Sequence, residues 1–209
     1  MSIFTIDGNI GCGKSTVLNY LHTHYRMPID PEPVQKWQPF LEEMYKHNTG
    51  AFEFQVRVWL DRCWIQQRPN MATMLMERSP YFQANVFVAA NLENGKLTIK
   101  EYNMLQEMYA KSMSLWVPAG YIYLRSNPLR CVERIAKRAR PCEQTIHPNY
   151  IARLHVLHEN AYMQAILMGI PVICIDVEGK SIPEIAAEIW NALCIMGMNK
   201  MMPASLHAQ

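Results

Sequence analysis

Short apolar runs alternate along the chain with longer stretches in which apolar residues recur at helical spacing. The strand-like runs cover residues 3–6, 27–30, 73–76, 120–124 and 171–175. The helical patterns cover residues 14–25, 52–67, 101–115, 128–138, 150–168 and 182–196. Strands that alternate with helices build parallel sheets covered on both faces, so the pattern predicts an α/β fold around a five-stranded parallel sheet.

The length of 209 residues predicts a single domain with a substantial core. We place this domain at residues 1–198. The last stretch, 199–209, has no periodic pattern and is expected to form a flexible C-terminal tail.

The charge balance argues against some classes of partner. A net charge of +2 gives no overall field that would favour nucleic acid or a membrane surface, and the basic residues that cluster lie in 130–140. The six cysteines contain no C-x-x-C pair, which indicates reduced thiols and a cytoplasmic protein. The first strand starts at residue 3, so no signal peptide is expected, and no apolar run approaches the ~18 residues of a membrane span.

Residues 8–15 read Gly-Asn-Ile-Gly-Cys-Gly-Lys-Ser and match the P-loop pattern between a strand and a helix. The glycines let the backbone N–H groups point at phosphate oxygens. Lys14 supplies a charge for the β- and γ-phosphates, and Ser15 offers a hydroxyl to Mg²⁺. We therefore predict ATP-type nucleotide binding by Gly8, Asn9, Ile10, Gly11, Cys12, Gly13, Lys14, Ser15 and Thr16.

Ligands of such sheets bind at the carboxyl ends of the strands, where this chain carries charged residues. Glu32 lies between two prolines on a stiff segment, and a carboxylate near a γ-phosphate can accept a proton from an attacking hydroxyl. Glu77 follows the third strand-like run, as does the acidic residue that steadies Mg²⁺ in other P-loop enzymes. Arg78 could hold Glu32 or a reacting oxygen. A turn glutamate and a structural Glu–Arg pair are the alternatives.

Two helical segments add candidate groups. Arg134, Arg138 and Arg140 form a basic segment that suits phosphoryl transfer, although such a run can also be a solvated face. In helix 52–67, one stripe carries Gln55, Val58 and Arg62, and the glutamine amide suits a nucleobase edge. The opposite stripe is apolar and is expected to face the core; it consists of Phe52, Val56, Trp59, Leu60 and Cys63.

Taken together in order, these segments give the chain a resemblance to the deoxynucleoside kinases. The motifs that carry it are the P-loop, Glu-Pro-Val-x-x-Trp (32–37), Met44-Tyr45, Phe54-Gln55, Glu-Arg-Ser-x-Tyr (77–81), Arg-x-x-x-Arg-x-Arg (134–140) and Leu-His-x-Leu-His-Glu (154–159). The resemblance implies a P-loop kinase fold with an arginine-rich lid, ATP and Mg²⁺ as cofactors, and a homodimer.

The resemblance also implies roles for individual residues. Glu32 would take the proton of the sugar 5′-hydroxyl, with Arg78 beside it. Tyr45 and Glu143 would hold the 3′-hydroxyl, and Gln55 would bond the base edge. The base would pack among Trp37, Phe54 and Phe87, with Met44 and Val58 nearby. The three arginines would cover the triphosphate, while Asp176, Val177 and Glu178 would pass the adenine of ATP.

One departure concerns base preference. Cytidine- and purine-preferring members pair an arginine matching Arg62 with an aspartate, where this chain has Gln83 and thymidine-preferring relatives have a small residue. Without an acidic partner, Arg62 is expected to turn outward or to bond the Gln83 carbonyl. Val58 would narrow the pocket as in pyrimidine-preferring members, so the resemblance favours pyrimidines. The alternatives are a purine-preferring kinase, a thymidylate kinase-type nucleoside monophosphate kinase, and a nucleotide-binding switch without a small acceptor.

Overall fold

The structure is a computed structural model that describes residues 2–63 and 73–197. Its strands are β1 (Ser2–Gly8), β2 (Ile29–Asp30), β3 (Thr73–Glu77), β4 (Gly120–Arg125) and β5 (Val172–Asp176). They form one sheet in the order β2-β3-β1-β4-β5, and every neighbouring pair is parallel. The predicted five-stranded parallel sheet is confirmed.

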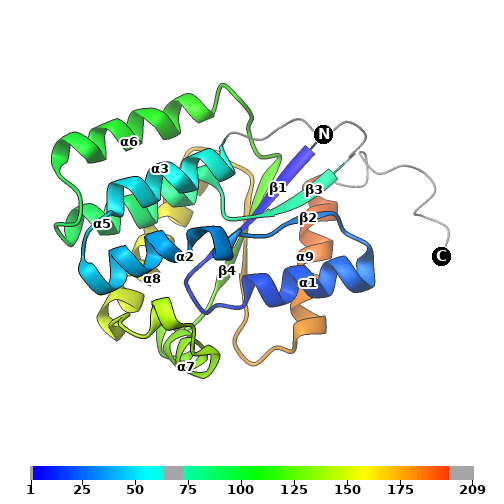
Figure 1. Ribbon diagram of the computed structural model, residues 1–209. Helices are drawn as coiled ribbons and strands as arrows, with labels where there is room; N and C mark the ends of the chain where they lie inside the picture. The colour runs from blue at the N-terminus through cyan, green and yellow to red at the C-terminus, as the bar shows by residue number, and fades with distance from the viewer. Residues whose placement is uncertain (1, 64–72, 198–209) are drawn as a thin grey trace.

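Helices cover both faces of this sheet (Figure 1). They are α1 (Lys14–Tyr25), α2 (Val34–Glu42), α3 (Ala51–Arg62), α4 (Pro80–Phe82), α5 (Ala89–Glu93), α6 (Ile99–Ser112), α7 (Pro128–Arg138), α8 (Pro148–Leu167) and α9 (Ile182–Ile195). Two π-helical turns, η1 (Glu43–His47) and η2 (Gln83–Val88), and a 3₁₀ turn, η3 (Pro141–Glu143), connect some of them. Within the described ranges, no helix is both long and apolar enough to span a membrane.

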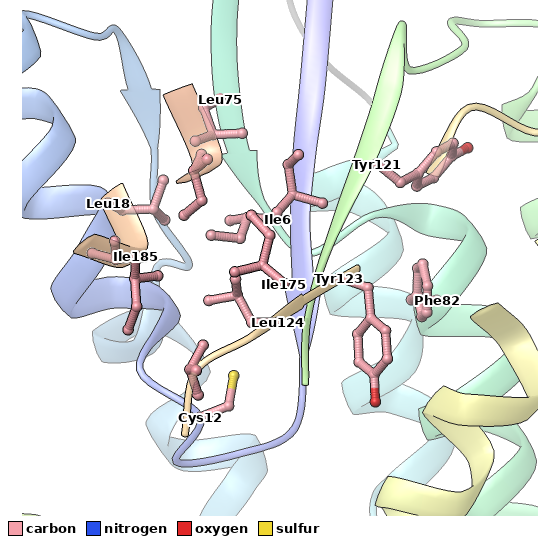
Figure 2. Packing of buried hydrophobic residues seen from close by; sticks show 14 of the residues in the cluster. Ile6, Cys12, Leu18, Leu75, Phe82, Tyr121, Tyr123, Leu124, Ile175 and Ile185 are labelled. Atoms are coloured by element: carbon pink, nitrogen blue, oxygen red, sulfur yellow. The ribbon is translucent and has the colours of Figure 1, made fainter. Parts of the chain in front are cut away.

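The helices α1 and α9 lie together on one face of the sheet, whereas α3, α6 and α8 lie on the other (Figure 1). Side chains of a strand alternate between the two faces. On β4, Leu124 therefore meets the Leu18 and Ile185 side of the core, while Tyr121 and Tyr123 pack toward Phe82 (Figure 2). The two faces together explain why the central strands are mostly apolar.

Two helical regions were not predicted from the sequence. The helix α2 contains Pro39 and follows Pro33, and such residues usually mark a helix boundary. In the segment from Pro80 to Glu93, the π-helical turn η2 interrupts the 3.6-residue period. The part of the predicted helix 52–67 beyond Cys63, and the predicted tail 199–209, lie outside the described residues.

The expected apolar stripe of helix α3 packs against the core at Phe52, Val56, Trp59 and Cys63, but not at Leu60. Gln55, Val58 and Arg62 are all buried, with exposed fractions of 1%, 1% and 4%, whereas Leu60 is 45% exposed. The physical reason is that α3 packs between α2 and α6 and lies beside a cavity, so the stripe with the polar residues also faces the interior. Of the expected apolar stripe, Cys63 is fully buried, while Phe52, Val56 and Trp59 are half-buried.

Candidate active site

A cavity of about 440 Å³ opens at the carboxyl ends of β1, β2 and β3. One end of the cavity is bordered by the P-loop and α7, through Ile10, Gly11, Gly13, Lys14, Ser15, Thr16, Arg134 and Arg138. The other end is bordered by Trp37, Tyr45, Phe54, Val58, Gln83 and Phe87. Charged residues from both ends meet between them. The cavity thus joins a phosphate-binding loop to an aromatic compartment.

The P-loop adopts backbone conformations that require glycine. Gly11 has φ = 81° and Gly13 has φ = 103°, in the left-handed region. A Cβ on Gly11 would also approach the Cys131 carbonyl oxygen to 2.6 Å. The helix α1 begins at Lys14 without a side-chain cap, so its first N–H groups stay available to an anion. Lys14 is 5% exposed, and its Nζ donates hydrogen bonds of 2.9 Å to the carbonyls of Gly8 and Asn9.

Glu32 lies beside this loop in an ion pair with Arg78. Burial would raise the pKa of Glu32, but the positive charges of Arg78 and Lys14 outweigh burial and lower it below its ordinary value. The Arg78 guanidinium also lies over the Phe87 ring, 3.9 Å from its centroid. The structure therefore holds an ionised carboxylate between the phosphate loop and the aromatic compartment.

Glu77 forms a second carboxylate next to Ser15. The Ser15 hydroxyl donates to Glu77 Oε1 at 2.9 Å, and the Glu32 backbone N–H donates to Glu77 Oε2 at 3.3 Å. Burial and the negative charge of Glu32 raise the pKa of Glu77. A hydroxyl and a buried carboxylate are hard oxygen donors, and a divalent cation would relieve the repulsion between the two carboxylates. Ser15 and Glu77 consequently fit Mg²⁺.

The arginine-rich segment borders the same cavity. Arg138 donates to Glu143 Oε2 at 2.5 Å, and Arg140 donates to Glu143 Oε1 at 3.3 Å. Arg134 donates to the Cys12 carbonyl at 3.4 Å. Lys137 also lines the cavity and was missed in the sequence. Its position three residues after Arg134, on the same side of α7, could have identified it.

In the aromatic compartment, Trp37 and Phe54 make an edge-to-face contact with ring centroids 5.8 Å apart. Gln83 lines the cavity, and its Nε2 donates to Gln55 Oε1 at 2.6 Å. Gln55 lies behind Gln83 rather than on the cavity wall. Tyr45 and Glu143 both line the cavity, and burial together with the nearby Tyr150 and Glu143 raises the pKa of Tyr45.

The expected environment of Arg62 was wrong. Arg62 neither turns outward nor bonds the Gln83 carbonyl. It is 4% exposed and forms an ion pair with Asp30 at 3.5 Å, and its Nη1 donates to the backbone carbonyls of Asp30 and Glu77. Asp30 therefore supplies the acidic partner that sequence comparison placed at position 83. Within the described ranges, Arg62 Nε and Gln83 Oε1 have no partner.

Several predicted residues do not line this cavity: Gly8, Asn9, Cys12, Met44, Gln55, Arg62, Asp176, Val177 and Glu178. Gln55 is linked to it through Gln83. Glu178 accepts hydrogen bonds from the Ser126 hydroxyl and the Asn127 N–H, and Ser126 is itself bonded by Arg134 at 3.3 Å. The segment 176–178 therefore contacts the start of α7 and lies next to the lid rather than over the P-loop.

Comparison with known proteins identifies the family of the chain. The model of the deoxynucleoside kinase family matches residues 4–194. The chain belongs to the deoxynucleoside kinase family. A deoxynucleoside kinase of this family phosphorylates deoxynucleosides with ATP, and the P-loop kinase fold is that of the family.

Its similarity to individual kinases is spread over several substrate types. The chain is 29% identical to mitochondrial thymidine kinase 2 of Homo sapiens, over 85% of this chain and 71% of that protein. It is 28% identical to deoxycytidine kinase 2 of Gallus gallus, over 83% of this chain and 81% of the relative. A probable deoxycytidine kinase of Fowlpox virus is 31% identical over 74% of this chain and 69% of its own length. These relatives do not agree on a base.

Proposed function

We propose that this deoxynucleoside kinase transfers the γ-phosphate of ATP to the 5′-hydroxyl of a pyrimidine 2′-deoxynucleoside, as a step of nucleotide salvage. The observation that carries the proposal is the position of Glu32. Its ionised carboxylate lies between the P-loop and the aromatic compartment, where the acceptor hydroxyl must meet the γ-phosphate. Such a carboxylate can take the proton of the hydroxyl as the new P–O bond forms.

The donor half of the reaction rests on the P-loop and the lid. Lys14 and the N–H groups of the loop bind the phosphates, and Arg134, Arg138 and Arg140 neutralise the charge that spreads over the transferred group. Ser15 and Glu77 would hold Mg²⁺, which would supply positive charge to offset the negative charge of the triphosphate. Asp176, Val177 and Glu178 remain our candidates for the adenine side, because Glu178 accepts hydrogen bonds from Ser126 and Asn127, directly before the lid helix.

The acceptor half rests on the aromatic compartment. Trp37, Phe54 and Phe87 offer ring faces and edges to a base, and Val58 limits the width available to it. Gln55 and Gln83 form a neutral amide pair that can both donate to and accept from a base edge. Tyr45 and Glu143 are our candidates for the sugar 3′-hydroxyl, and Met44 is buried in the apolar cluster against which Tyr45 packs.

Two alternatives make different demands on this compartment. A thymidylate kinase-type enzyme would bring a phosphate on its acceptor, which the ionised Glu32 would repel. A purine-preferring kinase would need a wider compartment than Val58 leaves. We further propose that residues 1–198 form the kinase domain, that the enzyme is a homodimer, and that it acts in the cytoplasm; the first two follow the pattern of the family.

The decisive experiment is a side-by-side assay of ATP-dependent phosphorylation. We expect kcat/KM for thymidine and deoxycytidine to exceed that for deoxyadenosine and deoxyguanosine by about tenfold or more. A purine is larger than the space beside Val58, and a misfit of this kind in an apolar pocket costs ~1–3 kcal/mol of transition-state binding. Thymidine monophosphate in the same assay tests the phosphate-acceptor alternative. Higher kcat/KM for either purine, or turnover of the monophosphate alone, would contradict the proposal.

The amide pair provides a second prediction. Replacing Gln83 by aspartate puts a charged acceptor on the wall of the aromatic compartment, which Gln83 lines. A carboxylate can accept from the amino group of cytosine but not from the 4-oxo group of thymine. We therefore expect the deoxycytidine-to-thymidine ratio of kcat/KM to rise about tenfold, as one hydrogen bond of ~1.4 kcal/mol would produce.

The matched control is Asn85→Asp, which adds the same charge on the exposed side of the same turn. An unchanged substrate ratio in Gln83→Asp, or an equal change in Asn85→Asp, would show that Gln83 does not face the base.

A further inference from the structure

Asp7 is a buried carboxylate that neither binds phosphate nor lines the cavity. It stands on β1 directly before the P-loop and is 1% exposed. Because side chains alternate along a strand, Asp7 points away from the face on which Ile6 packs (Figure 2). Burying a carboxylate is costly, so its retention in the sheet needs a specific partner.

That partner is the turn after β3. Asp7 Oδ1 accepts a hydrogen bond of 2.8 Å from the Ser79 backbone N–H, and the Arg78 N–H donates to the Ile6 carbonyl at 2.9 Å. Two consecutive N–H groups of this turn are therefore fixed to two consecutive residues of β1. A hydrogen bond to a charged acceptor is stronger than one between neutral groups.

The turn needs to be held because Arg78 has φ = 69°, a left-handed conformation. For a long side chain this conformation costs on the order of 1 kcal/mol or more and persists only where the surroundings enforce it. It is this conformation that directs the Arg78 guanidinium to Glu32 and over the Phe87 ring. A relaxed turn would move the guanidinium away from both.

We propose that Asp7 is a positioning residue for the transfer reaction: by accepting the Ser79 N–H, it holds Arg78 in the left-handed conformation that keeps Glu32 oriented. This inference rests on the proposed role of Glu32. Burial raises the pKa of Asp7 to about 6, while the Ser79 N–H and the charge of Arg78 favour its anion, so the acceptor is charged at neutral pH. The alternative is that Asp7 serves only the stability of the sheet.

A double-mutant cycle separates the two roles. Asp7→Val removes the acceptor with a side chain that suits a strand, Asp7→Asn keeps an acceptor oxygen, and Arg78→Ala removes the group that Asp7 positions. We expect Asp7→Val to lower kcat about 10- to 100-fold, with the KM for ATP nearly unchanged, because a small misplacement near the reacting groups is enough. Asp7→Asn should stay within about threefold of the unmodified enzyme because its amide oxygen can take the same N–H.

In the Arg78→Ala background, Asp7→Val should change kcat less than about threefold, since residues that act as a unit are not additive. The control is Thr73→Val, at the far end of β3, whose buried hydroxyl has no partner among the described residues. It should leave kcat unchanged. The melting temperature of every variant shows whether a lower kcat merely follows unfolding.

The outcomes are distinct. If Asp7→Val keeps full kcat, if Asp7→Asn is as impaired as Asp7→Val, or if the two effects are additive, the inference is wrong. If neither Asp7→Val nor Asp7→Ala folds, Asp7 serves the fold and the inference is also wrong. A normal kcat in Arg78→Ala alone would also contradict the inference, because Arg78 is the group through which Asp7 acts, whereas an unimpaired Glu32→Gln would contradict the proposed function.

Discussion

Glu32→Gln is expected to lower kcat by a factor on the order of 10² or more while ATP and nucleoside binding stay nearly intact. The amide has almost the same size and can still accept a hydrogen bond from Arg78, but it cannot take up a proton near neutral pH. In the unmodified protein, Arg78 and Lys14 keep the pKa of Glu32 below its ordinary value, so the ionised form is available for the reaction. The substitution therefore removes the proposed base without emptying the cavity.

The measurement is steady-state kinetics with a pyrimidine deoxynucleoside, together with the Kd of ATP and of the nucleoside for both proteins. Glu53→Gln is the matched control, because Glu53 is an exposed glutamate on α3 and should leave kcat unchanged. A Glu32→Gln enzyme with unimpaired kcat would exclude Glu32 as the base. Loss of nucleoside binding with unchanged kcat would assign Glu32 to substrate binding alone.

The parts of the fold that the sequence predicts are those with strong local signals. The five strands and the P-loop helix were found because apolar runs and the glycine pattern are short-range features. The helix α2 was missed because Pro39 lies inside it, and the segment from Pro80 to Glu93 because π-helical turns break the period. Such departures depend on packing, which a single sequence does not display.

Prediction of the site from the sequence meets the same limit as prediction of the fold. Of the segments that bound the cavity, those with Glu32, with Glu77 and Arg78, and with the lid arginines were predicted because they follow the carboxyl ends of strands, whereas the aromatic residues came from the family resemblance. The partners of those residues were not: Asp30 pairs with Arg62, and Asp7 bonds the Ser79 N–H across 72 positions of sequence. Long-range pairing of this kind follows from the order of strands in the sheet, where β3 lies between β2 and β1. Charged residues near strand ends therefore predict a site, but only the sheet order tells which of them meet.

Lys14→Ala is expected to abolish measurable turnover, with a loss in kcat/KM on the order of 10³ or more. Lys14 is buried in the P-loop and holds the Gly8 and Asn9 carbonyls, so in the folded protein its charge lies where the phosphates would bind. Alanine removes the positive charge that Lys14 places beside the transferred phosphoryl group. The lid arginines face solvent and do not replace this charge. The melting temperature without nucleotide should stay near that of the unmodified protein, while the stabilisation by added ATP should be lost.

Lys111→Ala is the matched control, since Lys111 is an exposed lysine of α6 paired with Glu107, and it should change neither turnover nor the ATP-dependent shift in melting temperature. Kinetics and thermal unfolding with and without ATP, on all three proteins, test the prediction. Retained turnover in Lys14→Ala would contradict the phosphate-binding role of the loop. A large fall in melting temperature without nucleotide would instead show that Lys14 serves mainly to stabilise the loop, through its bonds to Gly8 and Asn9.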